Sequence, residues 1–175
     1  MSEVVARLAV NYLRKYMFPV LPQDIRKVFP QISDPLGADT SGNPIGKNQV
    51  PNIVVGQYQD FGVGAATPII TVYCAGASEG MVNQYRHLDM HVDIWVGGNI
   101  AANVDGRRWV SIIYEYVYRT LQNTNWTGIP INGGHTVQIE RSFETERSPV
   151  LFEPTAKMYH ISNIYRVEAL SIVWY

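Results

Sequence analysis

The most regular pattern in the sequence is an alternation of apolar and polar residues between positions 88 and 96. Apolar residues occupy every second position, with aspartate, histidine and tryptophan between them. Side chains of a strand point alternately to its two faces, so this spacing is typical of a half-buried strand. The five residues predicted to face the core are Leu88, Met90, Val92, Ile94 and Val96.

A helical pattern follows this strand within a few residues. Apolar side chains recur three or four positions apart, which gives a wide apolar stripe along one side of a helix. The stripe consists of Trp109, Ile112, Ile113, Tyr116, Val117 and Leu121. A strand and a helix so close in the chain most simply bury their apolar faces together. We therefore expect this unit to be the framework of the protein.

The flanking segments predict the remaining elements. A helix is expected over about 3–17, with Ser2 as its N-cap and Pro19 ending it, and a shorter helix over about 23–29. Further strands are expected over about 53–58, 68–74, 135–144 and 158–175. The segments 75–84, 123–134 and 148–154 are expected to be connections.

Two of these strands carry more detailed expectations. Val137, Ile139 and Phe143 alternate toward one face of the strand over 135–144. The last strand is too long to be uninterrupted, so we expect a bulge or bend near Ser162 and Asn163.

The order of helix, strands, helix and strands favours an α+β fold. We expect a single domain over residues 1–175, with a mostly antiparallel or mixed sheet of about five strands and two main helices packed on one face. Residues 31–52 are dense in turn formers and predict a long loop or arm. This loop either orders on a partner or is slack, and the sequence favours neither reading.

Composition narrows the classes of function. The net charge is −1 and the sequence pI is about 6.4, so no general basic field attracts nucleic acid. Charged residues are 17% of the chain, below the roughly 25% usual for soluble domains. Eleven tyrosines and four tryptophans fit either an aromatic-rich core or a surface covered by partners. Cys74 is the only cysteine, which excludes a disulfide within the chain.

The sequence was also searched for a signal peptide and for a membrane-spanning run. Glu3 and Arg7 fall early in an amphipathic pattern rather than in a signal peptide, so synthesis in the cytoplasm is expected. No apolar run approaches the roughly twenty residues of a membrane span, so no membrane partner is expected.

The strand over 87–93 carries the one candidate metal site, because His87, Asp89, His91 and Asp93 share a face. The two histidines are about 13 Å apart on an extended strand and cannot bind the same ion. A solvated or interface face is the favoured interpretation. Cys74 lies in an apolar run that raises the pKa of a thiol, which disfavours a nucleophile. We predict no catalytic residue and no cofactor.

Surface features concentrate near the end of the strand over 135–144. A mixed-charge cluster, expected on a hairpin, consists of Glu140, Arg141, Glu144, Glu146 and Arg147. It is either a solvated strand edge or a set of charges that fixes the register between neighbouring subunits. The sequence Val150-Leu151-Phe152 follows and is expected to be exposed.

Four segments spread over most of the chain carry a resemblance to a known family. They are VARLAVNYL at 5–13, LDMHVDIWV at 88–96, RRWVSIIYE at 107–115 and YRVEALSIV at 165–173. In element order and texture the chain resembles the tail terminator, or tail completion, proteins of long-tailed bacteriophages. The loop over 31–52 departs from the short connections expected of that family.

The resemblance implies a structural virion protein rather than an enzyme, located in the tail or neck. It implies a homo-oligomeric, hexameric ring that caps the tail tube, ends tail polymerisation and joins the tail to a head–tail connector or neck protein. Genomic DNA would pass through the pore without sequence-specific contact. The family has no shared site motif to transfer. From the features above we take as candidate interface residues Asp39, Asn43, Glu144, Glu146, Arg147, Phe152, Trp174 and Tyr175.

Three other readings stay open at this stage. The first is a different head–tail connector or neck protein. The second is a small metal-binding enzyme that uses the strand over 87–93. The third is a monomeric α+β adaptor domain.

Truncation after Ala169 is expected to prevent folding or assembly. The six residues that follow are apolar on both faces of the predicted strand and need cover on both sides. Circular dichroism and native mass measurement of the truncated chain check this, and a soluble, fully assembled product would contradict it.

Overall fold

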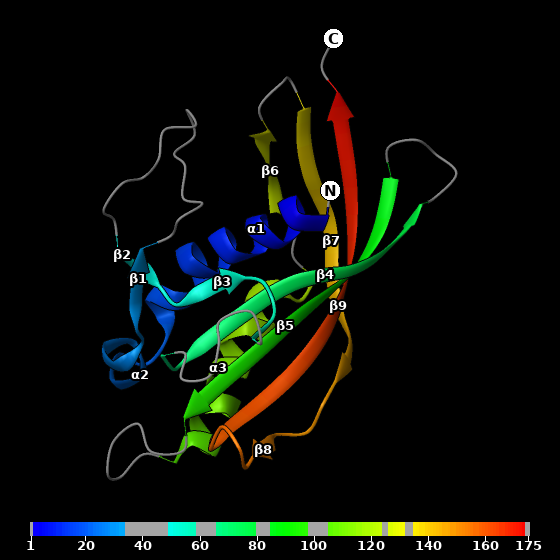
Figure 1. The fold of residues 1–175 in the computed structure, drawn as a ribbon. Coiled ribbons are helices and arrows are strands. Elements are labelled where there is room, and N and C mark those ends of the chain that lie inside the picture. The colour runs from blue at the N-terminus through cyan, green and yellow to red at the C-terminus, as the bar shows by residue number, and fades with distance from the viewer. Residues whose placement is uncertain are drawn as a thin grey trace.

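Two helices lie against one face of a twisted sheet in the computed structural model, which describes residues 2–33, 49–58, 66–79, 85–97, 105–123, 126–131 and 135–173 (Figure 1). The helices are α1 (Ser2–Tyr12) and α3 (Gly106–Leu121). The sheet contains both parallel and antiparallel pairs. The predicted α+β class, with a mixed sheet and two main helices on one face, is confirmed.

The sheet is built around β5 (Tyr85–Gly97) and β9 (Met158–Val173), which pair antiparallel. On the other side of β5 lie β4 (Ile69–Glu79), antiparallel, and then β3 (Ile53–Val55), parallel to β4. On the other side of β9 lie β7 (His135–Arg147), β6 (Trp126–Ile131) and, separately, β8 (Leu151–Glu153). The strand order is β3-β4-β5-β9-β7-β6, with β8 paired to β9 beyond the end of β7.

The core lies between the sheet and the helices, as the alternation over 88–96 predicts. All five inward residues of β5 are fully buried. On α3 the buried side chains are Trp109, Val110, Ile113, Tyr114, Val117 and Leu121, whereas Ile112 and Tyr116 of the predicted stripe are only partly buried. Full burial of one such aliphatic side chain contributes about 1.5–3 kcal/mol, so this one contact supplies a large part of the folding free energy.

The N-terminal helical segment continues past α1 without a break. A π-helical turn (Leu13–Met17) and a 3₁₀ turn (Phe18–Val20) follow, so Pro19 lies inside a helical turn rather than after the helix. Ser2 lies in α1 and is not a cap preceding it. The wider π turn places Leu13 and Met17 fully in the core. The predicted second helix is confirmed as α2 (Gln23–Val28).

Of the bulge or bend expected in the last strand near Ser162, the bulge is absent from its pairing with β5, and the register shifts lie in β7 instead. β9 pairs with β5 in one unbroken register from Leu170 to Met158. Across β9, β7 has irregularities between Ile139 and Arg141 and between Glu144 and Glu146. The strand pairing with β9 is then interrupted between β7 and β8, opposite Ser162. Extra residues in a shorter partner strand let the long strand stay continuous.

The first irregularity in β7 also overturns the prediction that Phe143 faces the same way as Val137 and Ile139. Val137 and Ile139 are buried under the helices, but after the shift it is Ser142 that is buried. The Ser142 hydroxyl donates to the carbonyl of Leu121 at the end of α3. A bulge shifts the side-chain alternation by one residue, so Phe143 points to the opposite face.

Strands extend into several segments that the sequence predicts as connections. β4 continues to Glu79, β6 occupies 126–131 and β8 occupies 151–153. The predicted loop over 31–52 begins and ends with two short strands that pair antiparallel, β1 (Gln31–Ser33) and β2 (Gln49–Pro51). Four of the candidate interface residues lie outside the described residues: Asp39, Asn43, Trp174 and Tyr175.

Replacing Gly106 by alanine is expected to destabilise the fold by roughly 1–3 kcal/mol, the usual cost of forcing extra atoms into a packed site. A Cβ at this position would lie 2.7 Å from the carbonyl oxygen of Gly97 and 3.1 Å from Cδ2 of Tyr159. Urea unfolding measures the loss. Ser111→Ala, on the exposed side of the same helix, is the control and should change stability by less than about 0.5 kcal/mol. Equal effects of the two variants would contradict the packing argument.

Candidate interaction surfaces

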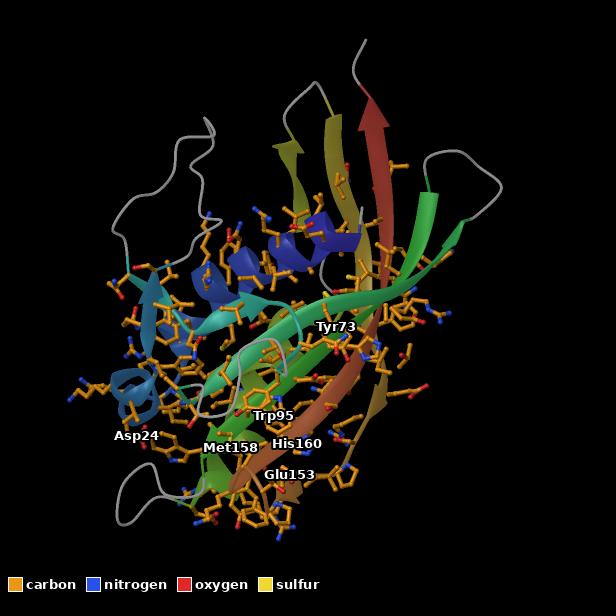
Figure 2. The ribbon with its side chains drawn as sticks, viewed as in Figure 1. Asp24, Tyr73, Trp95, Glu153, Met158 and His160 are labelled. Atoms are coloured by element: carbon orange, nitrogen blue, oxygen red, sulfur yellow. The ribbon has the colours of Figure 1, made fainter. Side chains whose placement is uncertain are left out.

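The face of the sheet opposite α1 and α3 is not covered by any helix of the described residues (Figure 1). Its outward positions do not follow a simple polar pattern. Ile69 and Thr71 are buried there, while Tyr73, Trp95 and Ile164 are partly buried. Tyr73, Trp95 and His160 are labelled on this face (Figure 2). A sheet face in water usually carries polar side chains, so aromatic and aliphatic groups at these positions are typical of a surface that contacts protein.

Three rings form a continuous stack across this face. The centroids of Tyr58 and Trp95 are 4.2 Å apart with an interplanar angle of 17°, and those of Trp95 and His160 are 4.2 Å apart at 14°. The Tyr58 hydroxyl donates to Sδ of Met158 at 3.2 Å. The stack connects Tyr58, three residues after the end of β3, with Trp95 of β5 and His160 of β9, so these three parts of the chain hold one another in place.

A second ring pair lies two outward-facing rows further along the same face. Tyr73 on β4 stacks on His91 on β5, with centroids 4.6 Å apart and rings 8° from parallel. Asp93 lies between His91 and the three-ring stack along β5. Burial raises the pKa of the Asp93 carboxyl, although Ser162 and the two nearby histidines oppose the shift. Burial likewise lowers the pKa of His160, against the attraction of Asp93 and Glu153.

The side chains of the candidate metal site are engaged in separate contacts. Asp89 accepts hydrogen bonds from the Arg166 guanidinium at 3.1 and 3.2 Å, and His91 is stacked on Tyr73. In the part of the chain that the structure describes, no three His, Cys, Asp or Glu side chains are grouped to hold a metal ion. Burial raises the pKa of Cys74 to about 12, which keeps the thiol protonated and unreactive.

The predicted charge cluster lies along β7 and is divided between the two faces of the sheet, not gathered on a hairpin. Tyr114 of α3 donates to the Glu144 carboxylate at 3.0 and 3.2 Å and accepts from the Arg147 guanidinium at 2.8 Å. Burial, then Glu144, raises the pKa of Tyr114 to about 12. Glu144 and Arg147 thus hold α3 against β7, and Glu146 is exposed. Their roles at an interface stay predictions.

Large apolar side chains are exposed at two separate places. The first, which we name the β8 patch, consists of Leu151 and Phe152, 44% and 50% exposed. Their exposure is as expected, whereas Val150 packs against the core. The second, which we name the helical patch, consists of Tyr16, Val20 and Val28, 49%, 59% and 37% exposed.

Sequence reasoning identified Phe152 but missed the helical patch and the ring stack. The π turn over Leu13–Met17, which the helical pattern does not predict, buries Leu13 and Met17 and leaves Tyr16 49% exposed. The stack depends on which strands are neighbours, and a single sequence carries no signal for that pairing.

Among the described helices, none combines the length and the apolar character needed to cross a lipid bilayer. No protein-family model matches the chain, and no curated protein matches it significantly. The resemblance to phage tail terminators therefore stays a prediction from the sequence.

Replacing His160 by glutamine is expected to flatten the dependence of stability on pH. Because the pKa of His160 is lowered in the folded protein, the unfolded state takes up the proton first as the pH falls below the ordinary imidazole value. The stability contributed by neutral His160 is therefore present above that value and is lost below it. Asp93, whose raised pKa contributes with the opposite sign in a more acidic range, is present in both proteins.

Urea midpoints at about pH 7.5 and about pH 5.5, on either side of the ordinary imidazole pKa, measure this effect. The wild-type midpoint should fall more than that of His160→Gln between the two pH values. An equal fall in both proteins would show that His160 is not the responsible group.

Proposed function

We propose that this protein is a structural subunit of a phage virion that forms a hexameric ring on the end of the tail tube. The ring stops tail polymerisation and offers its other side to the head–tail connector or neck protein. Its action is one of binding, and the proposal includes no catalytic step, metal or cofactor.

The one-sided sheet is the observation that carries this proposal. A sheet with helices on one face, and with stacked rings and partly buried aliphatic residues on the other, has a broad surface suited to protein contact (Figure 2). The titratable groups on that face are paired, stacked or buried one by one rather than gathered around one point. Such a surface supports a binding role better than a reaction.

The element order also supports the proposal. The four segments that carry the resemblance fall in α1, β5, α3 and β9, which together form most of the core. A tail terminator needs a rigid subunit whose periphery meets several partners at once. In this chain the interior is occupied by helix–sheet packing, and the exposed apolar groups lie at the edges.

Charge fits a pore that DNA traverses without being held. The net charge of −1 gives no general attraction for the phosphate backbone. A ring that bound DNA tightly would retard its passage.

Native mass measurement and negative-stain imaging of the purified protein test the proposal. A particle about six times the 19.7 kDa subunit, with a central hole, is expected. Added to polymerising tail tube protein from the same phage, it should bind tube ends and limit tube length.

Two outcomes would contradict the role in capping. In the first, the ring forms but tubes grow to the same length with and without it. In the second, the ring binds the connector or neck protein and does not bind the tube, which assigns the chain to the neck instead.

A further inference from the structure

The exposed apolar patches lie on opposite edges of the same part of the sheet. One row of residues runs across four strands, since Ile53 pairs with Ile70, Ile70 with Ile94 and Ile94 with Ile161. Next to Ile161 on β9, His160 pairs with Leu151 of β8. The order at this level is therefore β3, β4, β5, β9 and β8. With neighbouring strands about 4.8 Å apart, the two edges are separated by roughly 19 Å.

The helical patch belongs to the β3 edge. The Arg14 guanidinium donates to the carbonyl of Ile53 at 2.6 Å, and the backbone N–H of Asn52 donates to the carbonyl of Pro30 at 2.9 Å. These bonds attach both ends of the segment 14–30 to the start of β3. In Figure 1, α2 and β8 lie on opposite sides of the sheet.

The β8 patch belongs to the other edge. β8 has three residues, with Pro149 and Pro154 close to its ends, and pairs only with β9 among the described strands. The short length and the prolines limit backbone pairing at this edge, so a partner would contact its side chains. Phe152 rests on Tyr159 with ring centroids 4.9 Å apart, yet half of its side chain is exposed. Neighbouring large apolar side chains that are left exposed are typical of a surface that contacts protein.

The two edges carry opposite charge. Residues 14–28 contain four basic side chains and one acidic side chain, a net charge of +3. Residues 140–153 contain four glutamates and two arginines, a net charge of −2, and Lys157 in the following turn does not reverse this sign. An apolar centre on each side with complementary charge around it favours contact between the two different edges over contact of either edge with itself.

We propose that the β8 patch of one copy packs against the helical patch of the next copy. Because the two patches differ and lie on opposite edges, the contact is heterologous. A chain of such contacts always keeps one free β8 patch at one end and one free helical patch at the other. Repetition closes a ring when the rotation per subunit allows it. This inference rests on the ring form of the proposed function and assigns its subunit interface to named residues.

Two single variants, each of which replaces an apolar side chain of a patch by a charge of the sign carried by the opposing edge, test the pairing. Val20→Glu places an acid in the helical patch opposite the acidic edge, and Phe152→Lys places a base in the β8 patch opposite the basic edge. Each variant alone should sediment as a monomer at concentrations at which the wild type assembles. Both positions are at least half exposed, so the fold itself should keep its thermal unfolding midpoint. Asn11→Glu and Ser111→Lys, at exposed positions outside both patches, are the controls and should assemble like the wild type.

The decisive arm mixes Val20→Glu and Phe152→Lys in equal amounts. Each retains one intact edge that fits the intact edge of the other, and the two altered edges carry opposite charge. The mixture should therefore assemble at a 1:1 ratio, as heterodimers or larger alternating particles, which damaged subunits could not do.

Three results would overturn the inference: a wild type that stays monomeric, a single variant that assembles like the wild type, or a mixture that remains monomeric. Failure of the assembled wild type to bind tail tubes would contradict the proposed function while leaving this interface intact. Tube capping by both single variants would contradict this interface while leaving the proposed function intact.

Discussion

The unbroken pairing of β5 with β9 is the constraint on which the rest of the structure depends. Thirteen successive residue pairs, from Tyr85 with Leu170 to Gly97 with Met158, keep one register. A slip of one residue would turn every inward side chain of β5 toward the opposite face, so burial of that apolar set fixes the register. The strands next to this pair carry the irregularities. The register of β7 against β9 shifts twice, and the pairing is interrupted between β7 and β8. The long central pair thus stays regular because its neighbours accept the irregularities.

This arrangement separates the two faces of the molecule. The inward face packs against α1 and α3, and among the described residues no three His, Cys, Asp or Glu side chains are grouped to hold a metal ion. The outward face and the two edges carry ring stacks, the partly buried Asp93 carboxyl and, among the described residues, five exposed large apolar side chains. The two edges also differ in local charge. The proposed head-to-tail association of identical copies rests on that difference.

The sequence predicts the framework well because β5 and α3 carry strong periodic patterns, and packing agrees with those patterns. The fold class, the helix over 109–121 and the inward residues of β5 are confirmed. The errors have one physical origin, since bulges and strand pairing depend on distant residues. Phe143 changes face because β7 has a bulge between Ile139 and Arg141 where it pairs with the continuous strand β9. The 126–131 and 151–153 segments become strands because β7 and β9 offer them edges to pair with, despite Pro130 and the two prolines that flank β8. The site is less predictable still, because Tyr58, Trp95 and His160 meet only after the strand order is set.

Hydrogen–deuterium exchange on the assembled wild type and on its monomeric form, prepared by dilution, tests the central claim that contacts form at the two opposite edges of a rigid framework. Amides of β5 and β9 should exchange slowly in both states, since their bonds belong to the subunit. On assembly, exchange should slow both in segment 14–28 and in segment 150–153. Slowing at one of these edges alone, or at neither, would contradict the account.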